Sequence, residues 1–227
     1  MSSLHCVKFS SIHRKVIVLK VIVIGATGSI GRATVQDLLT DGHTVTAFAR
    51  NPTRLGIDHP ALHPWAGDAR DSGDLTRAIH GQDAVVVTLG AGASRKNKIR
   101  SEGTLNVIRA MQETGVRRLI VQSTLGAHES WANLNFFWKY LMFGLLLRPA
   151  HRDHELQESL VRASGLDWTI VRPSAFTDGP STGQFATGFG PDKRGLSLKI
   201  SRADLAGFLK QQITDRRHLH NAVAISN

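Results

Sequence analysis

At 227 residues, the chain is long enough to bury one continuous sheet and too short to add a second large domain. Its single cysteine, Cys6, excludes an intramolecular disulfide and a cysteine-based metal site, and favours a reducing compartment, so we expect a cytoplasmic protein. The formal net charge of +10 favours a polyanionic ligand without choosing among nucleic acid, an anionic membrane and a phosphorylated small molecule.

The distribution of the cationic residues argues against a dedicated nucleic-acid surface. Lys and Arg are scattered, and only the stretch SRKNKIR, residues 94–100, is dense; we interpret it as a solvated face. Residues 1–15 are predicted to form an N-terminal extension, because the start of the chain lacks the apolar core and cleavage site of a secretory signal. A transit peptide stays open, since this stretch contains Ser and Arg but no acid.

The first predicted elements are a strand, a helix and a second strand. The run over 16–24 is apolar except for Lys20, which predicts a strand buried on both faces and therefore a parallel sheet. An amphipathic helix over 29–40 follows, Gly42 ends it, and residues 44–49 form the next strand.

The same alternation continues to the end of the chain. A helix capped by Asp71 or Ser72 and ended by Gly81 comes next. Further helices are predicted over 97–113, 149–159 and 201–214, and further strands over 83–89, 117–124, 166–173, 195–201 and 221–226. The pattern predicts an α/β fold: a single doubly wound parallel sheet (Rossmann fold) with helices on both faces, over residues 16–227.

The segment 131–149 is strongly apolar and carries two of the four Trp and the only Tyr. It is too short for a membrane span, and Lys139 interrupts it. We interpret it as a core helix or as a lid over a pocket, and transient membrane contact stays open. As a lid it would cover a cleft between the loops QSTLGA and RPSAFTDG, with Phe137 and Trp138 against the ligand.

The sequence GATGSIG, residues 25–31, joins the first strand to the first helix. Gly25 is expected to make the tight turn, Gly28 to let the backbone approach a phosphate, and Gly31 to let the helix pack on the sheet. The helix N-terminus would then face an anion with free N–H groups and the positive end of its dipole. This combination predicts a dinucleotide-binding turn.

The end of the second strand indicates which dinucleotide binds. In NAD-specific sites an acidic residue about 20 positions past the turn holds the ribose 2′-hydroxyl. Here the strand ends in FARNPTRL, with Arg50 in that place and Arg54 close behind. A guanidinium pair suits a 2′-phosphate better than a hydroxyl, so the predicted cofactor is NADP(H). Two solvated arginines are the alternative.

From Val21 to the C-terminus, the chain resembles the atypical short-chain dehydrogenase/reductases, in particular the NADPH-dependent flavin and biliverdin reductase-like group. The stretches that carry this resemblance are GATGSIG, GDARD (67–71), GQDAVVVTLG (81–90), SEGTLNVIRAM (101–111), RASGLDWTIVRPSAFTDGPSTG (162–183) and ISRADLAGF (200–208).

The resemblance also implies where the cofactor and the reacting groups lie. It implies Thr27, Gly28, Ser29 and Ile30 at the pyrophosphate, Arg50 and Arg54 at the 2′-phosphate, Asp68 and Ala69 beside the adenine, Leu89 and Gly90 at the ribose, Ser123 and Thr124 near the nicotinamide, and the backbone of Pro173, Ser174 and Ala175 closing over it. Ligands of such sheets bind outside the carboxyl ends of the strands, which agrees with these positions.

One departure from the wider superfamily bears on the reaction. Standard members use a Tyr and a Lys four residues later to pass a proton. Here Ala150 and His154 stand in those places, and the only tyrosine, Tyr140, is followed four residues later by Gly144. The resemblance therefore implies hydride transfer to a flat conjugated acceptor, a flavin, tetrapyrrole or quinone, with the proton taken from solvent. His154 would relay a proton, bind an acidic group or only hold its helix.

Other chemistries find less support in the sequence. His151, Asp153 and His154 are the only residues near metal-ligand spacing, so no metal site is expected. Ser123 with His154 would suit a hydrolase, but VQSTLG is not a G-x-S-x-G turn. The partner we expect is a small-molecule acceptor, with the chain a monomer or homodimer. A non-catalytic NADP(H) redox sensor is the rival, and an RNA-binding protein is favoured only by the charge.

Overall fold

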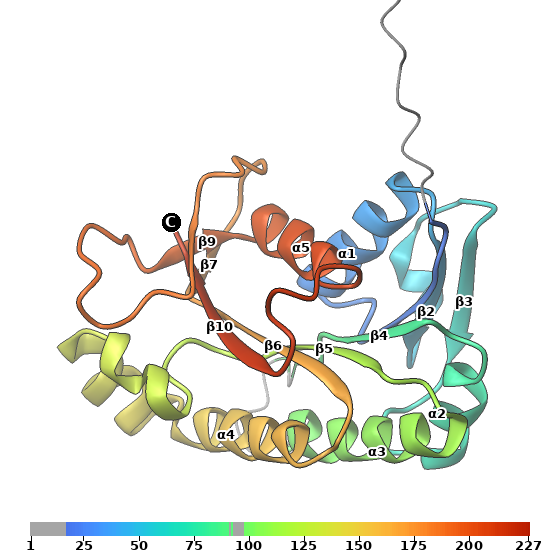
Figure 1. Ribbon diagram of the computed structural model, residues 1–227, viewed down its shortest axis with the longest axis horizontal. Coiled ribbons are helices and arrows are strands. Elements are labelled where there is room, and N and C mark those ends of the chain that lie inside the picture. Colours follow the sequence, from blue (N-terminus) through green and yellow to red (C-terminus); the bar gives the residue numbers. More distant parts are fainter. Residues whose placement is uncertain (1–16, 91, 93–97) are drawn as a thin grey trace, which may run out of the picture.

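The computed structural model describes residues 17–90, 92 and 98–227, and its centre is an eight-stranded sheet (Figure 1). The strand order is β3-β2-β1-β4-β5-β6-β10-β8, and every pairing is parallel except that of β8 with β10. The strands are β1 (Lys20–Ile24), β2 (Thr44–Ala49), β3 (Leu62–Ala66), β4 (Ala84–Val87), β5 (Arg118–Gln122), β6 (Asp167–Pro173), β8 (Ala186–Thr187) and β10 (Asn221–Ser226). A separate pair joins β7 (Ala175–Thr177) to β9 (Lys199–Ser201).

Helices cover both faces of the sheet, which confirms the predicted doubly wound α/β fold. One face carries α1 (Ser29–Thr40) and α5 (Arg202–Gln211), and the other carries α2 (Ser72–Ile79), α3 (Ile99–Thr114) and α4 (Arg148–Arg162) (Figure 1). Strand β1 shows why its sequence is continuously apolar. Val21 and Val23 belong to the core on the α1 side, whereas Ile22 and Ile24 belong to the core on the α3 side.

The structure differs from the predicted strands in two boundaries and in one strand that was not predicted. β1 begins at Lys20 rather than at residue 16, because pairing with β2 starts at Lys20 and the apolar residues before it, such as Ile17, are exposed. The strand predicted over 195–201 is limited to β9. β3 was not predicted, because only Leu62 of its five residues is buried and Pro64 interrupts it; both features suit an edge strand.

The strand order reverses between β1 and β4, and this reversal locates a crevice. From β1 the chain builds β2 and β3 outward on one side, then returns to add β4, β5 and β6 on the other. All these strands are parallel, so the residues that follow them lie along one edge of the sheet. In doubly wound sheets that edge, at the reversal, is where ligands bind.

The apolar segment 131–149 lies beyond that edge and leads into α4. It comprises the end of a 3₁₀ turn, η2 (His128–Asn133), and a π-helical segment, η3 (Phe137–Leu146). Leu134 and Phe143 pack against Leu125, which follows β5, and Ala224 of β10. In the described part of the chain, no helix is long and apolar enough to cross a membrane.

Candidate functional site

The turn between β1 and α1 needs its glycines for different reasons. Gly25 has φ +89°, and a Cβ there would lie 2.8 Å from the Thr88 carbonyl oxygen. A Cβ on Gly31 would collide with the Gly25 carbonyl oxygen, so this glycine sets how closely α1 approaches the turn. Gly28 is the N-cap of α1, which has no side-chain cap and no acid in its first turn. The free N–H groups and the dipole of α1 are therefore available to an anion.

A polar cleft of about 500 Å³ runs along the carboxyl ends of the strands, beginning at this turn. Most of the predicted site residues line it: Gly25, Thr27, Gly28, Ser29, Ile30, Arg50, Asp68, Ala69, Leu89, Gly90, Ser123, Thr124 and His154. Gly31 and Arg54 do not line it, and neither do Pro173, Ser174 and Ala175. The cleft is large enough for an extended nucleotide.

The two predicted arginines are placed differently. Arg50 is the first residue after β2, lines the polar cleft and has no hydrogen-bond partner or ion pair among the described residues. Arg54 lies in the short 3₁₀ turn η1 (Pro52–Leu55) and is exposed away from the cleft. Sequence reasoning missed Arg70, which lines the cleft and lies 3.3 Å from Glu102.

A second cavity, of about 310 Å³, adjoins the polar cleft, and we call it the apolar cavity. Its walls include Leu125, Leu134, Trp138, Phe143, Leu147, Ala150, Pro173, Ser174, Ala175 and Leu198. Arg100, Thr124, His154 and Phe176 line both spaces, so the two meet at these residues. Trp138 faces the cavity as predicted, but Phe137 does not: its side chain is exposed on the outside of η3.

Arg100, at this junction, corrects the interpretation of residues 94–100 as a solvated face; residues 94–97 lie outside the described part of the chain. Its side chain is only 15% exposed, and Nη1 lies 3.6 Å from Asp153 Oδ2. Burial lowers the pKa of the guanidinium, and Nε and Nη1 make no hydrogen bond. Buried donors without partners are costly, so Arg100 is suited to meet an oxygen atom of a ligand.

His154 is the other titratable group at the junction. Burial, and then the charge of Arg100, lower its pKa to about 3, so the imidazole is neutral at physiological pH. Its Nδ1 has no hydrogen-bond partner, and the hydroxyl oxygens of Ser123 and Ser174 are likewise buried and unpartnered. The junction therefore combines one cation with neutral polar atoms.

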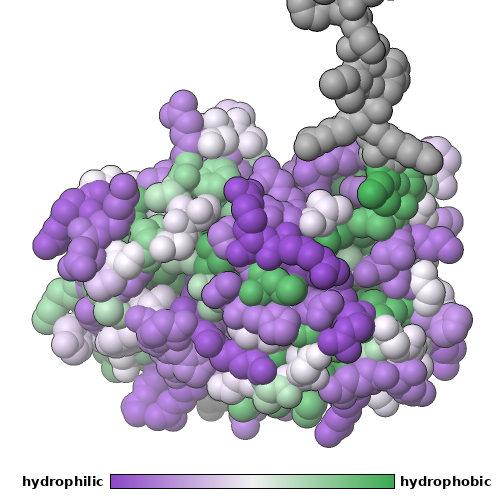
Figure 2. Space-filling view, viewed as in Figure 1, coloured by the Kyte–Doolittle hydropathy of each residue, from purple (hydrophilic) through white to green (hydrophobic). Residues whose placement is uncertain are grey.

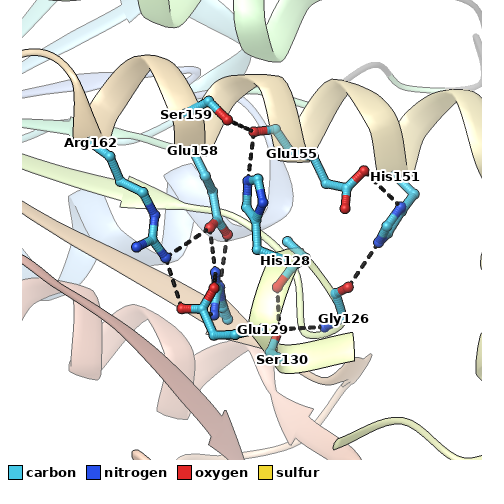
Figure 3. Close-up of polar contacts among 11 residues, drawn as sticks. Gly126, His128, Glu129, Ser130, His151, Glu155, Glu158, Ser159 and Arg162 are labelled. Carbon is cyan, nitrogen blue, oxygen red and sulfur yellow. Dashed lines mark hydrogen bonds and ion pairs between the residues drawn. The ribbon is translucent and has the colours of Figure 1, made fainter. Parts of the chain in front are cut away.

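The loop that follows β5 is fixed to α4 by hydrogen bonds, drawn in Figure 3. His151 Nε2 donates to the Gly126 carbonyl oxygen at 2.9 Å, and His128 Nε2 donates to the Glu155 carbonyl oxygen at 2.9 Å. Gly126 donates its N–H to Ser130 Oγ at 2.9 Å. These contacts hold the loop carrying Thr124 against the helix that carries His154.

Ion pairs reinforce this attachment from β6. Arg172 lies 2.6 Å from Glu158 of α4 and 2.9 Å from Glu129. Arg162 lies 2.8 Å from Glu129 (Figure 3). Burial opposes ionisation of Glu129, but hydrogen bonds from Arg172 and Arg162 outweigh it and lower the pKa of Glu129 to about 2. The sequence offered no signal for these pairs, because their members are far apart along the chain.

Asp153 and His151 have structural partners rather than the arrangement of a metal site. Asp153 accepts hydrogen bonds from the backbone N–H groups of Arg100 and Ser101 and from the Ser101 hydroxyl, which joins α4 to the start of α3. Across the described residues, no three His, Cys, Asp or Glu side chains are grouped so that they could hold a metal ion.

Comparisons with known proteins agree with this geometry. The chain matches the model of the NAD(P)H-binding family over residues 25–216. It is 27% identical over 211 residues to the UPF0659 protein YMR090W of Saccharomyces cerevisiae, covering 86% of this chain and 87% of that protein.

The fold is shared with solved structures, of which two bear on the site. ChuY, an anaerobilin reductase of Escherichia coli O157:H7, superposes with a TM-score of 0.75 at 23% identity, covering 91% of this chain and 96% of ChuY. A short-chain dehydrogenase/reductase of Veillonella parvula in complex with NADP superposes with a TM-score of 0.77 at 18% identity, covering 93% and 95%. The chain therefore belongs to the NAD(P)H-binding family.

Proposed function

We propose that the protein is an NADPH-dependent reductase that transfers hydride to a flat conjugated acceptor, such as a flavin, tetrapyrrole or quinone. The observation that carries this proposal is the junction of the polar cleft with the apolar cavity at Thr124, His154 and Phe176. A cofactor extended from the glycine turn to Thr124 would end where the apolar cavity begins. Hydride transfer needs this contact between two rings.

The residues of the polar cleft fit NADPH. The uncapped N-terminus of α1 would hold the pyrophosphate, and Arg50 would hold the 2′-phosphate. When bound, NADPH would supply the hydride. The relative that was solved with NADP supports this choice of cofactor by analogy, whereas Arg50 supports it by chemistry.

The apolar cavity suits the acceptor. Trp138, Phe143 and Leu147 would cover one side of a ring and exclude water, with segment 131–149 as the lid. Arg100 and Ser174 would meet the carbonyl oxygens that flavins, quinones and linear tetrapyrroles such as biliverdin carry. ChuY, which shares the fold, is an anaerobilin reductase, and this supports a bilin-like acceptor here.

The chain's own residues would supply orientation rather than an acid. Ala150 and His154 stand on α4 where the resemblance expects the Tyr and Lys, and Tyr140 is 61% exposed outside both cavities. A neutral His154 does not provide an imidazolium proton at physiological pH. We infer that the acceptor, once reduced, takes its proton from water.

The experiment that tests the function is NADPH oxidation by the purified protein with flavin mononucleotide, biliverdin and several quinones. We expect turnover with at least one of them that saturates with acceptor concentration. Tight NADPH binding without turnover on any acceptor would contradict the reductase and favour the redox sensor instead.

Replacing Trp138 by alanine is expected to raise the acceptor KM about tenfold, because the indole lines the apolar cavity. The Kd of NADPH should not change, since Trp138 does not line the polar cleft. Phe137→Ala is the matched control: this aromatic neighbour is 51% exposed and lines neither cavity, so its KM should equal that of the wild type. If both variants raised the acceptor KM equally, the proposal that segment 131–149 is a lid over the acceptor would be wrong.

Replacing His154 by alanine is expected to lower kcat by less than ~100-fold, because His154 is not expected to donate the proton. A positioned general acid contributes ~100-fold or more, so a larger loss would identify His154 as the donor. Because the pKa of His154 is about 3, kcat of the wild type should also show no inflection from this residue between about pH 5 and 8. The measurement is the pH profile of kcat for both proteins. An inflection near neutral pH that disappears in His154→Ala would make His154 the proton donor.

A further inference from the structure

The outer surface of η3 carries a concentration of exposed apolar side chains. Phe136 is 77% exposed, Leu145 69% and Tyr140 61%, and Phe137, Leu141 and Leu146 are also exposed. In the view of Figure 1 this segment lies at the lower left of the molecule, and Figure 2 shows green side chains among white and purple ones at that corner. Isolated exposed apolar residues are ordinary, but a contiguous group marks a surface that meets a partner.

The segment is apolar on both of its sides. Its inner side chains, Trp138, Phe143 and Leu147, line the apolar cavity, so they are already accounted for. The outer side chains stay between 41% and 77% exposed to solvent in the described part of the chain. A helix that is apolar all round is typical of a protein core or of a lipid environment. The outer side therefore requires a partner that is itself apolar at the contact.

The charges around this surface indicate the chemistry of the partner. No acidic residue occurs from residue 130 to residue 152, while Lys139, Arg148 and Arg152 fall within that stretch. Arg148 and Arg152 are exposed and lie one helical turn apart at the start of α4, directly after η3. Aromatic and leucine side chains bordered by cations are typical of segments that lie in the interface of an anionic bilayer.

A second copy of the chain fits these charges less well. A two-fold interface brings the same patch of each copy together, so Arg148 and Arg152 would face their own equivalents, and the stretch from 130 to 152 contains no acid of its own to meet them. An anionic lipid headgroup layer would supply the missing negative charge. Anionic lipid therefore satisfies both the apolar side chains and the cations.

We propose that residues 136–147, together with Arg148 and Arg152, bind peripherally to the surface of an anionic bilayer. The exposed side chains of Phe136, Tyr140 and Leu145 enter the headgroup region, and the two arginines contact the lipid phosphates. Because the inner side of the same segment lines the apolar cavity, binding would place that cavity at the lipid surface. The surface argument stands whether or not the protein is a reductase.

The test is sedimentation of the full chain with vesicles of phosphatidylcholine, alone or mixed with phosphatidylglycerol. We expect binding to the mixed vesicles that weakens as salt increases, and much weaker binding to phosphatidylcholine alone. The double variant Phe136→Ser/Leu145→Ser should bind the mixed vesicles at least on the order of tenfold more weakly than the wild type. Arg148→Glu/Arg152→Glu should lose the preference for anionic vesicles.

The matched control is Ile17→Ser/Val18→Ser, which removes two comparably exposed apolar side chains before β1. It should bind like the wild type, and thermal unfolding should be unchanged in every variant. Absence of wild-type binding to anionic vesicles, or an equal loss in the control, overturns the proposal. A dimer in analytical ultracentrifugation that Phe136→Ser/Leu145→Ser dissociates, without vesicle binding, also overturns it and assigns the surface to a second copy.

Discussion

Replacing Gly28 by valine is expected to raise the Kd of NADPH by on the order of a hundredfold or more while the protein stays folded. Gly28 has φ −70°, which any residue adopts, and a Cβ there would lie 3.3 Å from the Gly25 carbonyl oxygen and 4.0 Å from that of Thr88. The fold can accommodate that contact with a small shift. The cofactor cannot, because the valine methyl groups would fill the space at the N-terminus of α1 that a phosphate must approach.

Gly31→Ala is the comparison variant that separates an effect on folding stability from an effect on NADPH binding. Its Cβ would collide with the Gly25 carbonyl oxygen and lie 2.8 Å from Thr88 Oγ1, so it should lower the midpoint of thermal unfolding. Calorimetry and NADPH titration of both variants check this pair. Tight NADPH binding by Gly28→Val would show that no phosphate lies against the turn.

The glycine turn could be predicted because its signal is local. Seven consecutive residues specify a strand end, a turn and a helix start, and their spacing alone gives each glycine its place. The alternation of strands and helices was predictable for the same reason, since burial on both faces makes a strand such as β1 continuously apolar. β3 gave no such signal, because an edge strand buries little.

The residues that line the apolar cavity were harder to predict, because η3 is π-helical and does not have the period of an α-helix. The inward residues Leu134, Trp138, Phe143 and Leu147 are spaced by four, five and four positions, wider than an α-helix requires. An α-helical pattern does not separate the inner from the outer side chains of this segment. The sequence therefore singled out segment 131–149 and named Trp138, which lines the cavity, but it could not exclude Phe137.

Arg100 was misread because its environment is made by a distant part of the chain. Its neighbours in sequence are basic, which is typical of a solvated stretch. What buries it is α4, whose Asp153 accepts from the Arg100 backbone N–H and lies near its guanidinium. Contacts across 53 positions leave no periodic trace in a single sequence.

Replacing Arg50 by aspartate is expected to reverse or remove a preference for NADPH over NADH. A guanidinium can meet a 2′-phosphate with two parallel charge-assisted hydrogen bonds, and losing such a contact costs ~1.5 to 3 kcal/mol, or about one to two powers of ten in affinity. Aspartate should cost more, because it sets a carboxylate against the phosphate. It also offers an acceptor to a ribose hydroxyl, so NADH binding should hold or improve.

Arg54→Asp provides the matched control for this prediction. It makes the same change of charge four residues away, but Arg54 does not line the polar cleft, so only a weak long-range effect is expected. The measurement is the Kd of NADPH and of NADH for the wild type and for both variants. Equal losses in the two variants would mean that net charge, rather than a contact with Arg50, attracts the cofactor. A wild type that binds both cofactors equally would leave Arg50 directed to solvent, and the interpretation of FARNPTRL would be wrong.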